Sequence, residues 1–290
     1  MRAIRQRASA LVYALLILSA GAARAQDPAD LRVMSFNIRY GTAQDSDNHW
    51  NRRRSFLTDV IRAPAPHVLG VQEALGFQLD EIRAALPQYA QAGVGRDDGR
   101  KGGEYSPILF DSTRLTLLAN GTFWFSDTPE TPGSTSWGNR ITRICSWAIL
   151  HDRTTSRSFA VFNVHWDHES QPSRERSAAL LLERIAARDN PELPVLVTGD
   201  FNAGESNAAF RKLVTDDVVK LRDTFRVIAP TADSVGTFNA FEGRRSGDKI
   251  DAILASPEWR VTRAQIVLTA RAGRYPSDHF PVTAVVRLGS

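Results

Sequence analysis

The chain has 290 residues, of which 42% are hydrophobic and 23% are charged. This composition is ordinary for a globular protein and excludes a mainly disordered chain, a collagen-like repeat and a long coiled coil. The formal net charge is +4, from 36 basic and 32 acidic residues, but residues 1–25 contain four arginines and no acid. The remainder therefore carries 32 residues of each sign, which argues against a broad nucleic-acid-binding surface.

Residues 1–25 have the pattern of a secretory signal peptide. A basic start leads into a short apolar run at 10–18 and then into Ala23-Arg24-Ala25, a cleavage-site pattern of small residues. The run is shorter than the roughly 20 residues that a membrane-spanning helix needs. We therefore expect export to the periplasm or the extracellular space without stable membrane insertion. Residues 26–290 are expected to form a single domain, and no feature of the sequence indicates a protein partner.

Short apolar runs alternate with a few amphipathic helices along the rest of the chain. The expected helices cover 54–62, 77–85 and 174–188. The expected strands cover 31–38, 68–72, 105–110, 114–118, 121–125, 145–151, 157–164, 194–198, 250–254, 261–268 and 282–288. The middle third lacks the helix after every strand that a doubly wound parallel sheet requires. The pattern instead predicts a mixed α/β (α+β) protein, with two packed sheets flanked by helices.

Polar side chains occur wherever an apolar strand ends. They are Asn37 and Arg39, Glu73, Asn163 and His165, Asp200 and Asn202, Asp248 and Asp251, and Asp278 and His279. An aspartate after a strand is commonly a turn former, but six such clusters indicate a site at one rim of a layered fold. Carboxylate and amide oxygens favour Mg²⁺, Mn²⁺ or Ca²⁺ over zinc. A divalent cation, paired carboxylates and histidines are the groups that phosphoester hydrolysis requires.

These clusters also form short motifs that occur together in a known family. They are Ser35–Ile38, Gly70–Glu73, Asn163–His165, Thr198–Asn202, Lys249–Asp251 and Ser277–His279. In these motifs the sequence resembles the endonuclease/exonuclease/phosphatase superfamily, over about residues 31–288. The most similar branch is a secreted bacterial one related to the carbon-catabolite-repression deadenylases. The resemblance implies a four-layer α/β sandwich of the deoxyribonuclease-I-like fold. It also implies a Mg²⁺- or Mn²⁺-dependent phosphoesterase, with Ca²⁺ as a further candidate ion.

The resemblance further implies a metal centre beside a water-activating carboxylate. Glu73 is the expected main metal ligand, with Asn37 nearby and Asp278 as a ligand or a supporting carboxylate. Asp200 is expected to orient or deprotonate the attacking water, while Asn202 holds that water or a phosphate oxygen.

The same resemblance assigns the histidines to the phosphate. His279 is expected to bind it, with its other ring nitrogen held by Asp251. His165 is expected to contact the phosphate or to assist the leaving group. The chain departs from the family at two positions, because His67 stands where Asp is common and Asn239 stands where His is common. We interpret His67 as a surface or loop residue, and Asn239 puts one substrate contact in doubt.

Three further residues are candidates for substrate binding. Tyr105 is a candidate for a hydrogen bond to phosphate, and Arg143 is a candidate for either a phosphate contact or a structural ion pair. His168 is expected to contact the substrate or to support the site. The aromatic-rich segment 121–137 is either a platform for bases or lipid or a strand of core aromatics, and the core interpretation is favoured.

Several functions remain open at the level of the sequence. The expected substrate is a phosphate ester, with nucleic acid first and sphingomyelin or inositol phosphates as alternatives. The run from His165 to His168 is also found in dinuclear zinc hydrolases, but Asn163 occupies the place where those enzymes need another histidine. A catalytically silent binding module is the alternative of another class, and the presence of Glu73, Asp200 and His279 argues against it.

Overall fold

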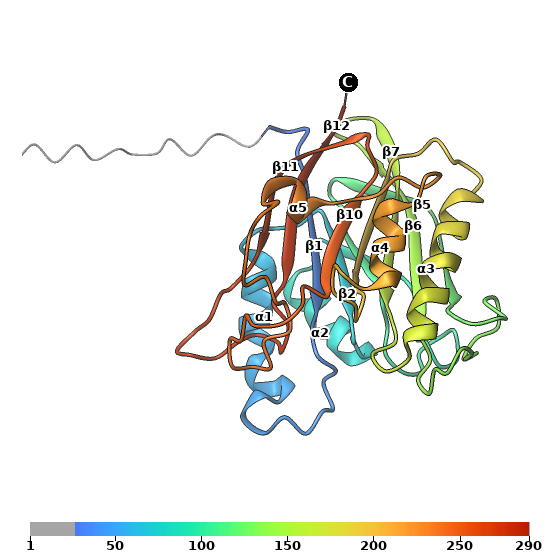
Figure 1. The fold of residues 1–290 in the computed structure, drawn as a ribbon. Helices are drawn as coiled ribbons and strands as arrows, with labels where there is room; N and C mark the ends of the chain where they lie inside the picture. Colours follow the sequence, from blue (N-terminus) through green and yellow to red (C-terminus); the bar gives the residue numbers. More distant parts are fainter. Residues whose placement is uncertain (1–26, 290) are drawn as a thin grey trace, which may run out of the picture.

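The protein is a sandwich of four layers, in which two β-sheets lie face to face and helices cover the two outer faces (Figure 1). The computed structural model describes residues 27–289. The architecture confirms the predicted fold class. The predicted signal peptide, residues 1–25, lies outside the described residues, so its removal and the expected export stay predictions.

The first sheet has six strands, with β1 at its centre. In spatial order the strands are β11 (Trp259–Ile266), β12 (Val282–Leu288), β1 (Leu31–Asn37), β2 (Val68–Gln72), β4 (Ile108–Asp111) and β3 (Tyr89–Ala92). β1 runs parallel to β2 and antiparallel to β12. The end of β1, the end of β2 and the start of β12 therefore lie at the same rim of the sheet.

The second sheet also has six strands and repeats this arrangement around β8. In spatial order the strands are β5 (Leu115–Trp124), β6 (Ile144–Asp152), β7 (Arg157–His165), β8 (Val195–Asp200), β10 (Asp251–Ala255) and β9 (Arg222–Asp223). β7 is parallel to β8, and β10 is antiparallel to β8. The two strands expected at 114–118 and 121–125 are one strand, β5, whose pairing with β6 shifts register between Leu117 and Ala119.

Three apolar clusters fill the three interfaces between the four layers. One lies between the sheets and includes Val33 and Val161. A second packs helices α1 (Trp50–Arg62) and α2 (Gly76–Ala85) on the first sheet. The third packs α3 (Gln171–Ala186) and α4 (Ala208–Thr215) on the second. A short helix, α5 (Thr224–Ile228), and a 3₁₀ turn, η1 (Ser46–Asn48), complete the elements.

Helix α3 begins three residues earlier than its apolar periodicity predicts. The Ser170 side chain accepts a hydrogen bond from the backbone N–H of Ser173, and Pro172 occupies the first turn. Both features stabilise a helix start. Within the described residues, none of the helices combines the length and the apolar character needed to cross a membrane.

Polar side chains join the two sheets close to the rim where the parallel strands end. The Asn163 amide donates to the carbonyls of Val71 and Pro107, and its oxygen accepts hydrogen bonds from Gln72 and Thr198 at 2.7 and 2.9 Å. A Cβ atom at Gly70 would lie only 2.1 Å from Thr198 Oγ1. The close approach of the sheets at this point therefore depends on glycine.

His67 differs from its predicted position at the surface. It lies in the loop before β2, but it is buried, and its Nδ1 accepts a hydrogen bond from the backbone N–H of Arg32 at 3.0 Å. Burial, together with the nearby Arg114, lowers the pKa of His67 to about 4. Of the two predicted positions, the loop is therefore confirmed and the surface is not, because this neutral imidazole is buried and holds the start of β1.

Candidate active site

Six strand ends bring the predicted site residues to one rim of the sandwich. Asn37 ends β1, Glu73 follows β2, and His165 ends β7. Asp200 ends β8 directly opposite Asp251, the first residue of the antiparallel strand β10. His279 precedes β12. The parallel and antiparallel pairings described above thus explain why residues from distant parts of the chain meet.

Two carboxylates converge on the side chain of Asn37. Its amide nitrogen donates to Glu73 Oε1 at 3.0 Å and to Asp200 Oδ2 at 2.9 Å. Glu73 has a backbone φ of 60°, a left-handed conformation that is strained for a residue with a side chain. Because such strain costs free energy, its presence at the strand end supports a functional role for the Glu73 carboxylate.

A histidine–aspartate pair lies beside these carboxylates. His279 Nδ1 is 2.9 Å from Asp251 Oδ2, and His279 Nε2 is 3.8 Å from Asp200 Oδ2. Burial by itself lowers the pKa of His279, but Asp251 and Asp200 raise it well above its usual value. The two carboxylates therefore favour the imidazolium form of His279. Burial, and then the charge of Asp251, raise the pKa of Asp200 to about 7, in the range useful to a general base.

His165 is in the opposite charge state. Burial, and then Arg143, lower its pKa well below the usual value. Arg143 Nη1 lies 3.1 Å from His165 Nε2, and arginine has only donors, so the imidazole must be the acceptor. Arg143 Nη2 also donates to His168 Nδ1 at 2.8 Å, and its Nε lies 3.5 Å from Asp167 Oδ2. Arg143 thus forms a structural ion pair and also faces the site.

The donor set at the rim fits a hard divalent cation. Ligand atoms of Glu73, Asp200 and His279 lie within 4.8 Å of one another. The His279 ring is protonated and held by Asp251, so the carboxylates are the groups suited to a cation, as Mg²⁺ prefers. Asp278 is also nearby, and burial raises its pKa. A cation here would offset the repulsion among these carboxylates, of which Asp200 and Asp278 are buried.

The side-chain amide of Asn37 is oriented differently from that of a metal ligand. Its nitrogen faces the carboxylates, and its oxygen accepts a hydrogen bond from the backbone N–H of Arg39. In this orientation Asn37 ties Glu73 to Asp200, and coordination through its oxygen would require the amide to rotate. The role of Asn37 as a ligand therefore stays a prediction.

A cavity of about 500 Å³ opens onto this centre. Its walls include most of the predicted site residues: Glu73, Arg143, His165, His168, Asp200, Asn202, Asp278 and His279. Asn37 and Asp251 are buried behind them. Tyr105 lies outside the residues that line the cavity, and its hydroxyl donates to the carbonyl of Arg100 at 3.1 Å. In the structure the Tyr105 hydroxyl thus holds a loop, and its contact with phosphate stays a prediction.

Arg39, which the sequence placed among the strand-end clusters, also lines the cavity. Six further lining residues were not predicted as site residues: Tyr40, Arg96, Glu104, Ile141, Phe238 and Ile250. All six lie outside the helices and strands of the structure, and the loops that carry most of them have no periodic apolar signal. Asn239, the position of doubt, is fully buried, and its amide donates to the carbonyl of Ser277. It holds the loop that carries Phe238 and lies outside the cavity lining.

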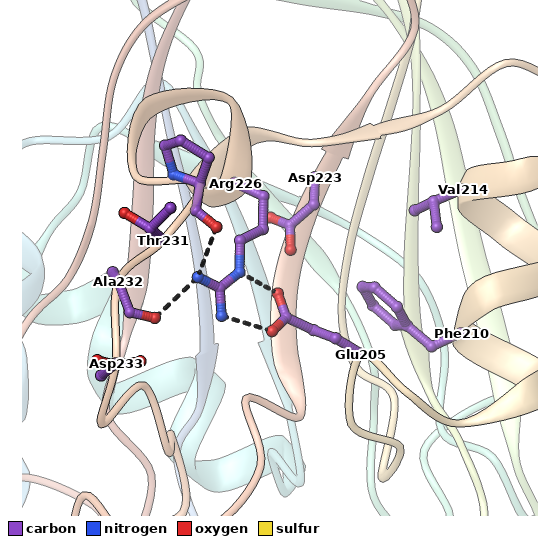
Figure 2. A pocket seen from close by; sticks show the side chains of 9 residues that line it. Glu205, Phe210, Val214, Asp223, Arg226, Thr231, Ala232 and Asp233 are labelled. Carbon is purple, nitrogen blue, oxygen red and sulfur yellow. Dashed lines mark hydrogen bonds and ion pairs between the residues drawn. The ribbon is translucent and has the colours of Figure 1, made fainter.

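Lys249, which precedes Asp251 by two residues, has a structural role. Its side chain is fully buried, with Nζ 2.6 Å from Asp223 Oδ2 and 3.6 Å from Glu205 Oε1. A separate pocket of about 520 Å³ lies beside this cluster, and there Arg226 binds both oxygens of Glu205 and nearby carbonyls (Figure 2). These charges are paired with one another, so they stabilise the start of β10.

Comparison with known proteins agrees with this geometry. The sequence model of the endonuclease/exonuclease/phosphatase family matches residues 34–279. The chain belongs to this family. Its members are phosphoesterase hydrolases that typically use divalent metal ions, which supports a phosphoesterase in general for this chain.

Similar proteins with solved structures span almost the whole chain. An endonuclease/exonuclease/phosphatase from Bacteroides vulgatus is 33% identical with a TM-score of 0.83, covering 90% of this chain and 99% of that one. A mannosyl-6-phosphatase from Bacteroides thetaiotaomicron is 32% identical with a TM-score of 0.81, covering 88% and 99%. The catalytic domain of human Nocturnin shares the fold, with 18% identity, a TM-score of 0.73 and coverage of 90% and 94%.

Proposed function

We propose that the protein is an exported, divalent-metal-dependent phosphoesterase that hydrolyses a phosphate ester by attack of water. The observation that carries the proposal is the convergence of two units. One is the Glu73–Asn37–Asp200 cluster, and the other is the Asp251–His279 pair, whose free Nε2 lies 3.8 Å from Asp200. Together they place the Asp200 carboxylate, which can accept a proton, beside the His279 imidazolium, which can bind phosphate.

A bound Mg²⁺ or Mn²⁺ would be held by Glu73, with Asp278 and Asp200 nearby, and would act as a Lewis acid on a phosphate oxygen. His279, as an imidazolium, donates from Nε2 to another phosphate oxygen and stabilises charge that grows in the transition state. Asp200 orients water and takes its proton. The water oxygen bonds to phosphorus, the bond from phosphorus to the alcohol oxygen breaks, and the alcohol leaves with a proton returned through solvent.

A small phosphomonoester is the first candidate substrate. The relative with the printed name mannosyl-6-phosphatase is 32% identical and is matched over 99% of its length. The equal numbers of basic and acidic residues in 26–290 favour a small ester over a long nucleic acid, which needs a basic surface. Nucleic acid, the first expectation from the sequence, is the second candidate.

A lipid substrate is less well supported. That alternative predicted exposed aromatic side chains in segment 121–137. Phe123, Trp124 and Phe125 are instead buried, and both phenylalanines belong to the core between the second sheet and its helices. The core interpretation of this segment is therefore the one that the structure supports.

The test is a hydrolysis panel on purified residues 26–290. Substrates are a hexose 6-phosphate, a chromogenic phosphodiester, single-stranded DNA and RNA, inositol phosphates and sphingomyelin, each with Mg²⁺, Mn²⁺, Ca²⁺ or EDTA. We expect hydrolysis of at least one class that EDTA abolishes. The variants Asp200→Ala and His279→Ala should lose at least about 100-fold in kcat, as expected for loss of a catalytic base or a charge-stabilising donor. A folded variant with near-normal kcat would refute the mechanism.

A further inference from the structure

One wall of the active-site cavity consists of paired charges that the proposed chemistry does not use. Arg96 binds Glu104 through both nitrogens of its fork, at 2.7 and 2.9 Å. Beside this pair Arg143 is balanced by Asp167. The two arginines are thus neutralised by two carboxylates. This wall has no net positive charge with which to bind a second phosphate. Such a wall is suited to neutral groups that both donate and accept hydrogen bonds, such as hydroxyls.

The Arg96–Glu104 pair is held rigidly before any ligand arrives. The two residues face each other across a loop, where the backbone N–H of Arg96 donates to the carbonyl of Glu104 at 3.0 Å. Trp124 Nε1 donates to the carbonyl of Arg96 at 2.6 Å, and the Tyr105 hydroxyl donates to Arg100 within the same loop. Because little freedom is left to lose, binding at this wall costs little ordering entropy.

Apolar side chains line another part of the same cavity. Of the eight large apolar side chains that are exposed in the described part of the chain, two line this cavity: Phe238, 46% exposed, and Ile141, 37% exposed. They come from different loops, and both lie close to catalytic groups. Exposed apolar surface beside charged groups in one cavity is typical of a place where a ligand packs.

Phe238 is a fixed platform. Its neighbours pair with the segment before β12, because Phe280 N–H donates to Thr237 and Asn239 N–H donates to Asp278, at 2.7 and 2.6 Å. The Phe238 ring meets the His279 ring edge to face, with centroids 5.2 Å apart. The open part of the phenyl ring is therefore presented next to the group that would bind phosphate.

We propose that these two surfaces select the alcohol of the substrate, and that the enzyme prefers phosphate esters of sugars. The Arg96–Glu104 pair binds ring hydroxyls, and Phe238, with Ile141, packs against the C–H face of the sugar ring. This inference rests on the proposed phosphoesterase function and adds its specificity-determining residues. A ring that carries hydroxyls at its edge and C–H groups on its face matches both surfaces.

Three phosphomonoesters distinguish the contact with the ring hydroxyls from the contact with the C–H face of the ring. Mannose 6-phosphate has the ring and the hydroxyls, cyclohexylmethyl phosphate has the ring alone, and ethyl phosphate has neither. We expect the wild-type kcat/KM to rise at least about tenfold at each step from ethyl to cyclohexylmethyl to mannose, since burial of the C–H face of a ring and charge-assisted hydrogen bonds each suffice for such a factor. Glu104→Gln should remove the advantage of mannose over cyclohexylmethyl.

Phe238→Ala tests the second surface. It should raise KM about tenfold for both ring substrates and lower the ratio of their kcat/KM to that of ethyl phosphate by about the same factor. Phe238→Tyr should restore the ring preference. Leu118→Ala is the matched control, because Leu118 is exposed on β5 and lies outside the cavity lining. A thermal melt of each variant confirms that it is folded.

Several outcomes would overturn the proposal. Equal losses on all three esters in Phe238→Ala would show that the ring only supports His279. If Glu104→Gln still prefers mannose 6-phosphate to cyclohexylmethyl phosphate, Glu104 does not bind the ring hydroxyls. Higher kcat/KM for adenosine monophosphate than for mannose 6-phosphate in the wild type would show that the cavity selects a nucleobase.

Failure of the proposed function gives a different result. If the wild type hydrolyses no ester, binding of mannose 6-phosphate and cyclohexylmethyl phosphate is measured by saturation-transfer NMR in EDTA. A signal that Glu104→Gln weakens for mannose 6-phosphate alone, and that Phe238→Ala weakens for both, supports the sugar site without the chemistry. Absence of binding by the wild type overturns the inference.

Discussion

The Asp251→Asn substitution should move the alkaline limit of activity to lower pH. Asp251 Oδ2 lies 2.9 Å from His279 Nδ1 and is among the groups that raise the pKa of this buried histidine against the effect of burial. Asparagine keeps the shape and removes the charge. A hydrogen bond to a charged group contributes about 1.5–3 kcal/mol, and one pKa unit corresponds to about 1.4 kcal/mol. The pKa of His279 should therefore fall by about one to two units.

The direction of the effect follows from the raised pKa. Activity that needs the His279 imidazolium is present below the pKa in the folded protein and is lost as the pH rises through it. The stability that the protonated ring contributes is fully present below its unfolded pKa and is lost over the same rise. The assay is kcat/KM against pH, over roughly pH 5 to 10, in which the alkaline limb reports this group.

A buried carboxylate elsewhere supplies the control. Asp152 is buried at the end of β6 away from the site, where it pairs with Arg114 at 2.7 Å. Asp152→Asn should reduce stability without moving the alkaline limb. The reasoning fails if the limb of Asp251→Asn stays in place, or if both variants move it equally.

Three further predictions concern stability and metal binding. Lys249→Met should lower the free energy of unfolding by about 3–5 kcal/mol, since it leaves a buried carboxylate without its cation; urea denaturation measures this, and a value below about 1 kcal/mol would contradict it. Gly70→Ala should cost about 3 kcal/mol by the same assay, because the new methyl group meets Thr198 Oγ1, and unchanged stability would show that the sheets can separate there. Mn²⁺ at about 100 times its Kd should stabilise the wild type by about 2.7 kcal/mol in thermal melts, and Glu73→Gln should remove most of that gain; equal stabilisation of the variant would place the metal elsewhere.

The residue types at the strand ends were predictable from the sequence. Apolar runs mark the strands, and Glu73, Asp200 and His279 stand directly beside them. Parallel neighbours end at the same rim, so the gathering of these side chains follows from strand order once the layered fold is inferred. The structure brings together the predicted residues at this rim, with Tyr105 outside the cavity.

Only the tertiary structure decided which hydrogen-bond partner each polar side chain has and whether that side chain is buried. The Asn37 amide turned its nitrogen to two carboxylates, and His67 became buried although its sequence position is a loop. Hydrogen-bond geometry of this kind depends on atoms from elements far apart in the chain, and periodicity carries no information on it.

By itself the sequence determined most of the strands, their polar ends and therefore the class of chemistry, but it missed the short strands β3 and β9. It left undetermined which loops reach the site, because loop conformation depends on packing against other elements and has no periodic signal. Glu104, Ile141 and Phe238 line the cavity from three separate loops, which lie far apart in the chain and meet only in the folded protein. Local sequence thus specifies the catalytic groups, and tertiary packing specifies the surfaces that choose the substrate.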